Sequence, residues 1–261
     1  MHDADGVDES TMLAFARETR LSETTFVQSP TVAEADYRNR IWTVGEELPF
    51  AGHPSLGTAV AVARARGTTG AVRYVQQTGA GLQPIEVKLN GAGATASMLQ
   101  EPATFGPELK PADALEPLAL RPSAHHPDLP PQIVSTGLPQ LMLLLREAED
   151  LSQIKPDFAA IRALVEPHGA FGVYAAYYDP ATGAARARYF ARDPGIAEDP
   201  ATGSAAGPLC AYLNQRTGCL AVEITQGVEM GRPSRLRTES VEGRVRVSGD
   251  VAVVIDGTVT L

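Results

Sequence analysis

Two short stretches of this 261-residue chain nearly repeat each other. Residues 52–59 read GHPSLGTA and residues 198–205 read EDPATGSA, with Pro, Gly, Thr or Ser, and Ala in register at an offset of 146 (199 − 53). Each stretch opens an alanine-rich run. The repeat therefore predicts two related lobes, each directing a loop and a helix start toward a shared site. His53 brings an imidazole to one loop, and Asp199 brings a carboxylate to the other.

The charge and the apolar pattern exclude several classes of protein. The net charge is −9, whereas binding to nucleic acid or to an anionic membrane needs a basic face. No apolar run approaches the roughly 20 residues that span a bilayer, and the N-terminus is polar. We therefore expect a cytoplasmic protein that binds neither nucleic acid nor membrane.

The hydrophobic periodicity predicts mixed α and β structure. Helices are expected at residues 9–20, 58–66, 157–165 and 204–215. Strands are expected at residues 24–27, 38–44, 71–77, 83–89, 94–100, 132–135, 140–146, 171–178 and 185–191, and from 222 to the end. This order fits an α+β fold with mostly antiparallel sheet and one buried helix in each half.

Prolines concentrate in residues 102–131, with little periodicity beyond a short helical patch near 112–120. We interpret this region as the connection between an N-terminal lobe, residues 1–108, and a C-terminal lobe, residues 109–250. Two units of 146 residues exceed 261, so one copy is expected to be short at an end. The closing segment, residues 251–261, is expected to return as a strand that completes the first lobe.

Taken one at a time, the polar residues of these blocks have ordinary explanations. Asp199 followed by Pro200 is a standard helix start, with Asp199 as the N-cap. The same DPATG string at 179–183 joins two strand-like runs and predicts a hairpin turn. A single loop histidine such as His53 is usually a hydrogen-bonding residue, and Glu23 alone is most simply a solvated acid.

The pairing of the blocks favours a binding site. Two helix starts preceded by small-residue turns offer backbone N–H groups and positive dipole ends to an anion. A small anionic ligand could be held there without lysine or arginine.

No residue pattern predicts a metal or a cofactor. His125 and His126 lie in the proline-rich region with only one acid nearby, and Cys210 and Cys219 lack metal-ligand spacing. Nucleotide-binding and zinc-protease motifs do not occur. We therefore expect buried free thiols, no metal and no cofactor.

Several of these blocks together resemble one family, the phenazine-biosynthesis PhzF-like isomerases, which are relatives of diaminopimelate epimerase. The matching strings are LSETTFV at 21–27, RIWT at 40–43, ELPFAGHP at 47–54, STGLP at 135–139, EDPATGS at 198–204, QG at 226–227 and MGRPS at 230–234. They occur in the family's order over most of the chain, which makes the resemblance specific.

The resemblance implies two pseudo-symmetric lobes, each an antiparallel β-barrel-like sheet around a central helix, with the active site between them. It also implies a homodimer and cofactor-free catalysis. The family's catalytic residues match Glu23, His53 and Asp199. Its ligand-contacting positions match Gly52, Gly203 and Ser204, with Ser22 as a weaker candidate. The thiol pair of diaminopimelate epimerase has no match at these loops.

Family members usually begin with a strand, a Gly-Asn-Pro loop and a second strand, and this chain begins at the turn that follows them. We therefore expect the first lobe to lack its first strands, which makes activity the open question.

The expected reaction moves a proton between carbons of a small anionic, cyclic and carboxylated metabolite. Glu23 would act as the base, with its pKa brought toward working pH by burial. Two alternatives stay open: a binding or scaffold protein that retains the fold, and an amino-acid epimerase with a base on each face of the substrate.

Overall fold

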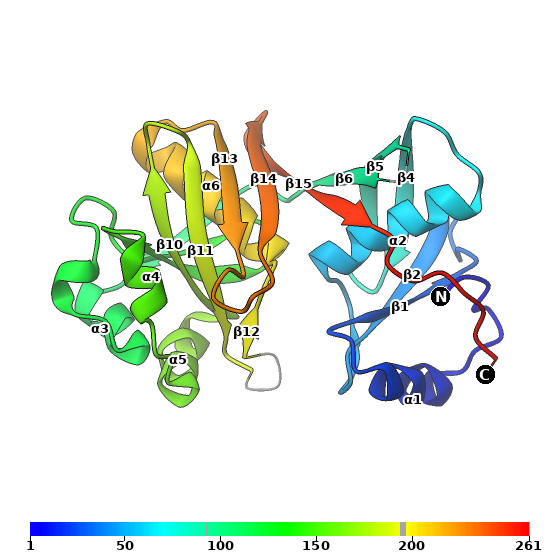
Figure 1. The fold of residues 1–261 in the computed structure, drawn as a ribbon, viewed down its shortest axis with the longest axis horizontal. Coiled ribbons are helices and arrows are strands. Elements are labelled where there is room, and N and C mark those ends of the chain that lie inside the picture. Colours follow the sequence, from blue (N-terminus) through cyan, green and yellow to red (C-terminus); the bar gives the residue numbers. More distant parts are fainter. Residues whose placement is uncertain (92, 194–196, 261) are drawn as a thin grey trace. The chain divides into compact units, whose positions relative to one another are not determined.

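The computed structural model describes residues 1–91, 93–193 and 197–260. The chain divides into two compact units: Met1–Met98 together with the C-terminal segment from Ser248, and Leu99–Val247 (Figure 1). The expected lobe boundary at 108/109 differs from this division, because residues 99–108 belong to the second unit.

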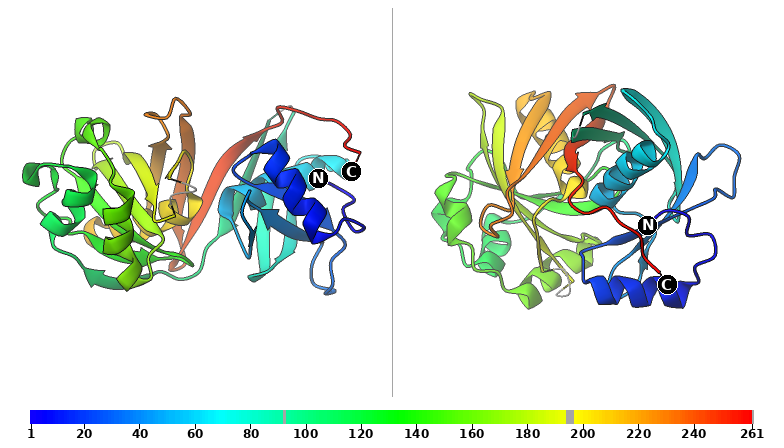
Figure 2. Two further views of the ribbon diagram at one scale, coloured as in Figure 1. Left: turned by 90° about the horizontal axis from the view of Figure 1, so that it is seen from below. Right: turned by 45° about the vertical axis from the view of Figure 1, so that its right-hand side comes forward.

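The first unit is a sheet built around one central helix. Its elements are α1 (Glu9–Thr19), β1 (Thr24–Gln28), β2 (Tyr37–Trp42), β3 (Glu47–Leu48), α2 (Gly52–Ala65), β4 (Ala71–Thr78), β5 (Gly81–Asn90) and β6 (Gly93–Leu99). The strands run in the order β1-β2-β4-β5-β6, and β3 pairs with β2. Leu56, Val60 and Ala63 of α2 pack on Tyr74 and Ile85 of the sheet, and Figure 2 shows α2 against these strands.

The second unit repeats this plan and extends it. Its elements are β7 (Thr104–Glu108), α3 (Pro111–Leu115), β8 (Gln132–Ser135), β9 (Pro139–Leu145), α4 (Glu149–Gln153), α5 (Phe158–Val165), β10 (Gly172–Asp179), β11 (Ala184–Ala191), β12 (Glu198–Asp199), α6 (Gly203–Thr217), β13 (Ala221–Gln226), β14 (Ser234–Val241) and β15 (Arg244–Ala252). The strands run β15-β14-β13-β11-β10-β9-β8-β7, and β12 pairs with β11. β15 begins in this unit and ends in the first.

The two units share one topological repeat. In each, an antiparallel hairpin (β1–β2 or β10–β11) is followed by a two-residue strand on its second member, a long helix and a parallel return (β2–β4 or β11–β13). α2 begins at Gly52 and α6 at Gly203, and the two-residue strands begin at Glu47 and Glu198. Both give an offset of 151 (203 − 52 and 198 − 47). The expected offset of 146 is therefore wrong at this point of the fold.

Nearby residues set the helix ends as expected, except at the start of α2. Asp8 caps α1 by accepting a hydrogen bond from the Thr11 N–H at 2.9 Å, and Gly218 ends α6 in the left-handed region at φ 76°. α2 begins six residues before the expected start at residue 58 (58 − 52). Pro54 lies in its first turn, where the missing N–H has no carbonyl partner to lose.

Two further expectations need correction. The proline-rich region contains β7, which pairs with β8 at the end of the strand order. β15 ends at Ala252, so residues 253–260 of the expected closing strand have no regular structure, and Leu261 lies outside the described residues. No helix in the described part of the chain is long and apolar enough to cross a membrane.

Candidate functional site

Glu23 occupies the corner where α1 gives way to β1. Arg20 ends the helix in the left-handed region, at φ 52° and ψ 31°, and this turns the chain toward the sheet. Thr24 then pairs with Trp42 in register. These constraints leave the Glu23 side chain only 15% exposed. It is a largely buried carboxylate at the edge of a sheet and not a solvated surface acid.

His53 is the partner of that carboxylate. It is the second residue of α2 and lies in the helix, where the sequence suggested a loop. Its Nε2 atom is 2.9 Å from Glu23 Oε2, and 45% of the imidazole is exposed. A hydrogen bond of 2.8 Å from Thr58 Oγ1 to Thr25 Oγ1 ties α2 to β1. The first unit therefore brings together two of the residues expected to be catalytic.

The contact between Glu23 and His53 has the character of an ion pair. The two atoms lie within hydrogen-bonding distance, and the pair is ionic when the imidazole is protonated. Burial raises the pKa of Glu23, but the close imidazole, its positive charge when protonated, and the Ser22 hydroxyl together outweigh burial and lower it. The expectation that burial brings this pKa toward working pH is therefore wrong for this arrangement.

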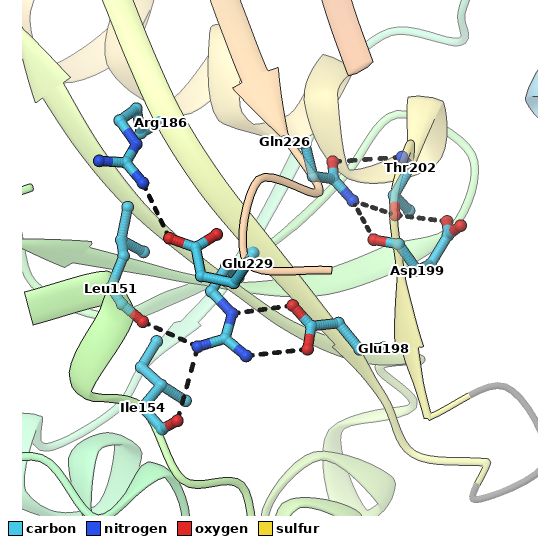
Figure 3. Close-up of polar contacts among 9 residues, drawn as sticks. Leu151, Ile154, Arg186, Glu198, Asp199, Thr202, Gln226 and Glu229 are labelled. Atoms are coloured by element: carbon cyan, nitrogen blue, oxygen red, sulfur yellow. Dashed lines mark hydrogen bonds and ion pairs between the residues drawn. The ribbon is translucent and has the colours of Figure 1, made fainter. Parts of the chain in front are cut away.

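Asp199 belongs to the two-residue strand β12 and is half-buried. Its Oδ2 atom accepts a hydrogen bond of 2.6 Å from Thr202 Oγ1, and its backbone carbonyl accepts one of 2.6 Å from Gln226 Nε2 (Figure 3). Pairing with Tyr189 of β11 keeps Asp199 extended, so Thr202 becomes the N-cap residue of α6. The interpretation of Asp199 as a helix N-cap is therefore wrong, whereas the same string at 179–183 does join β10 to β11.

Gly203 and Ser204 are the first two residues of α6. The Gly203 carbonyl accepts a hydrogen bond of 2.9 Å from Gln100 Nε2, and Ser204 is half-buried. At the structural offset of 151, Gly203 corresponds to Gly52 and Ser204 to His53. The imidazole and Asp199 are thus not equivalent positions of the repeat, and Asp199 corresponds to Leu48.

A pair of buried arginines near the site was missed from the sequence. Arg188 of β11 binds both carboxylate oxygens of Glu198 at 2.8 Å, and Arg40 of β2 binds Glu47 in the same two-pronged way (Figure 3 shows the Glu198 pair). Each glutamate lies on the two-residue strand that leads to α6 or α2. The available signal was an arginine two residues before an aromatic inside a strand, at 40–42 and 188–190.

The remaining titratable candidates have structural surroundings. Burial raises the pKa of the Cys210 thiol to about 11, which keeps it protonated. His125 Nε2 lies 3.1 Å from the Leu129 carbonyl oxygen, and burial lowers the pKa of this histidine. Within the described ranges, no three His, Cys, Asp or Glu side chains gather as a metal site would require.

Comparison with known proteins places this geometry in a family. The family model described as phenazine biosynthesis-like protein matches residues 1–257. The chain is 36% identical over 268 residues to trans-2,3-dihydro-3-hydroxyanthranilate isomerase of Pseudomonas aeruginosa, covering 98% of this chain and 90% of that protein.

Solved structures agree on the fold. A predicted epimerase from Pseudomonas aeruginosa is 31% identical with a TM-score of 0.81, covering 98% of this chain and 92% of that chain. A probable proline racemase from Agrobacterium radiobacter has a TM-score of 0.61 at 13% identity, covering 97% and 84%, and shows the fold alone. These likenesses confirm the expected α+β fold of diaminopimelate epimerase type.

Proposed function

Because the chain belongs to the family of phenazine biosynthesis-like proteins and is an isomerase, we propose that it moves a proton between two carbons of a small anionic metabolite. The proposed substrate is cyclic and carboxylated, and the reaction proceeds by general acid–base catalysis without a cofactor. Glu23 is proposed as the base, with His53 and Asp199 as the other catalytic residues.

The contact between Glu23 and His53 is the observation that carries this proposal. A carboxylate that is 15% exposed and held 2.9 Å from an imidazole has a lowered pKa, so it is ionised at neutral pH. It can accept a proton without prior activation, and the adjacent imidazole can exchange protons with a substrate group or solvent. Such a pair suits abstraction of a proton from a carbon beside a conjugated system.

The helix starts support an anionic substrate. Ala51, the N-cap residue of α2, has no polar side chain, and the hydroxyl of Thr202, the N-cap residue of α6, is directed to Asp199. The first-turn N–H groups of both helices are therefore not capped by these residues. A carboxylate is a suitable acceptor for such groups, and the positive end of the helix dipole favours it.

The relatives' names support the proposed substrate class. Trans-2,3-dihydro-3-hydroxyanthranilate is a partly saturated ring that carries carboxylate, amino and hydroxyl groups. Its saturated carbons adjoin the ring's double bonds, which stabilise the carbanion left when a proton is removed. We propose this compound, or a ring carboxylate of the same kind, as the substrate. Gly52, Gly203, Ser204 and Ser22 are proposed to contact it.

The test is incubation of the purified protein with trans-2,3-dihydro-3-hydroxyanthranilate in D₂O, followed by NMR. We expect an isomer with a displaced double bond and with deuterium only at the carbon that receives the proton. Saturable binding without any turnover would contradict the proposal and favour a binding protein.

An epimerase is the second candidate, favoured by the likeness to the structure described as a predicted epimerase. It makes a different forecast for the same experiment. When a panel of free amino acids replaces the ring carboxylate, an epimerase would incorporate deuterium at the α-carbon and invert its configuration.

A further inference from the structure

Gln226, the last residue of β13, uses every hydrogen-bonding position of its side chain. Its Nε2 atom donates to the Asp199 carbonyl at 2.6 Å and to Thr202 Oγ1 at 2.9 Å. Its Oε1 atom accepts from the Thr202 N–H at 3.2 Å and from Tyr174 Oη at 2.9 Å. The residue is fully buried, so these partners alone satisfy it. Figure 3 shows its contacts with Asp199 and Thr202. Reversing the amide would set its oxygen against the Asp199 carbonyl oxygen, so the orientation is fixed.

This orientation fixes the direction of the neighbouring hydrogen bond. An amide nitrogen can only donate, so Thr202 Oγ1 must accept from Gln226. The single hydroxyl proton of Thr202 is then left for Asp199 Oδ2, 2.6 Å away. Gln226 therefore holds the Asp199 backbone carbonyl in place. It also leaves the Thr202 hydroxyl proton for the hydrogen bond to the Asp199 carboxylate.

The first unit contains the same arrangement at α2. Gln76 of β4, the strand that corresponds to β13, is also fully buried. Its Nε2 atom donates to Ser55 Oγ at 2.8 Å, and that hydroxyl donates to the Ala51 carbonyl at 2.7 Å. Its Oε1 atom accepts from Asn39 Nδ2 at 3.0 Å. A buried amide again donates to a hydroxyl at a helix start, and that hydroxyl donates onward to a backbone carbonyl, here in the first turn that carries His53.

We infer that Gln226 and Gln76 are positioning residues for the reaction, Gln226 acting through Asp199 and Gln76 through the α2 turn that holds His53. This inference rests on the proposed function, because it takes the roles of Asp199 and His53 from there. What matters at both positions is the donor nitrogen and not the volume of the side chain. A methylene chain of equal length fills the space but leaves Thr202 or Ser55 free to redirect its proton.

The test compares Gln226→Met and Gln226→Glu with a matched control, Gln132→Met. Gln132 is also buried, in the same unit, and donates to the Gly106 carbonyl at 3.0 Å, away from Asp199. We expect Gln226→Met to lower kcat/KM for the ring carboxylate by about tenfold to 100-fold, the usual effect of losing buried hydrogen bonds. The control is expected to stay within about threefold of the wild type.

Gln226→Glu separates hydrogen-bond direction from packing. The introduced carboxylate accepts protons only, so it draws the Thr202 hydroxyl away from Asp199 at neutral pH. Burial raises the pKa of that carboxyl, and protonation returns one donor. The ratio of kcat/KM for Gln226→Glu to that of the wild type is therefore expected to rise at least about threefold between pH 8 and pH 6. A flat ratio would overturn the inference, as would a Gln226→Met enzyme no weaker than Gln132→Met.

Asp199→Asn shows whether a negative result concerns the positioning role of Gln226 or the proposed function itself. If Asp199→Asn keeps wild-type turnover, the role proposed for Asp199 is wrong. If Asp199→Asn loses turnover while both Gln226 variants keep it, only the positioning role is wrong. Circular dichroism verifies folding, and if both Gln226 variants fail to fold, the same pH ratio measured on Gln76→Glu decides the question.

Discussion

The buried ion pair behind Asp199 gives a quantitative prediction for the second unit. The Arg188 side chain is 9% exposed and that of Glu198 is 18% exposed, and two 2.8 Å hydrogen bonds join them. Arg188 Nη1 also donates to the Leu151 carbonyl at 2.8 Å. Glu198→Gln keeps the shape but leaves a buried guanidinium without its counter-charge. Breaking a buried pair in this way costs about 3–5 kcal/mol. Arg188 keeps its hydrogen bond to the Leu151 carbonyl, and the introduced glutamine still offers one acceptor oxygen. We therefore expect Glu198→Gln to lower the free energy of unfolding by about 3 kcal/mol, the lower end of this range.

Glu47→Gln is the matched comparison in the first unit. Glu47 is 33% exposed, and Arg40 keeps a second carboxylate, Glu9, at 2.9 Å. Arg40 is as buried as Arg188, at 9% exposed, but it keeps a counter-charge, and losing the more solvated partner of such a group is expected to cost no more than the roughly 1 kcal/mol of an exposed pair. We expect Glu47→Gln to cost about 1 kcal/mol.

Urea unfolding measures both variants. Circular dichroism follows the whole chain, and the fluorescence of Trp42, the sole tryptophan, follows the first unit. Two fitted transitions are required if the units unfold separately. Equal losses in the two variants, or a loss below about 1 kcal/mol for Glu198→Gln, would refute the reasoning from burial.

Two further predictions follow from the site and from the corrected helix start. His53→Gln removes the imidazole whose hydrogen bond and, when protonated, positive charge lower the pKa of Glu23, so burial dominates and that pKa rises. Because the base must be ionised, the acid limb of the kcat/KM–pH profile is expected to move to higher pH, and an unmoved limb would show that His53 does not act on Glu23. Gly57 lies inside α2, and nothing stands within 4 Å of an added Cβ. Gly57→Ala is therefore expected to raise the free energy of unfolding by about 0.5–1 kcal/mol, whereas a loss in urea titration would mean that this turn is not helical.

Local chemistry was enough to predict most of the framework. The Asp8 cap, the Gly218 terminus and the alternation in strands such as Gly93–Leu99 are encoded within a few residues. β7 could not be predicted in this way, because Pro107 lies within it and proline removes a donor from a strand. The strand is tolerated because it lies at the end of the sheet, with an irregular register between Phe105 and Glu108.

The residue offset between the two repeats could not be predicted from the sequence, for a different reason. Matching letters favour aligning Gly57 with Gly203, but the first lies inside a helix and the second begins one. Only the pairing of β3 with β2 and of β12 with β11 fixes the equivalence of Glu47 and Glu198. His53 was placed in a loop because the helix was expected to begin at residue 58. The proline that follows His53 is compatible with the first turn of a helix, where the structure places it.

The role of Glu23 as the proton-transferring base is the central claim, and Glu23→Gln in D₂O tests it most directly. The amide keeps the shape of the side chain but cannot accept the proton. We expect turnover of the ring carboxylate and deuterium incorporation to fall by about 10²–10⁴-fold, with the dissociation constant for a product analogue nearly unchanged in calorimetry. Turnover and deuterium incorporation near the wild-type level would contradict the account.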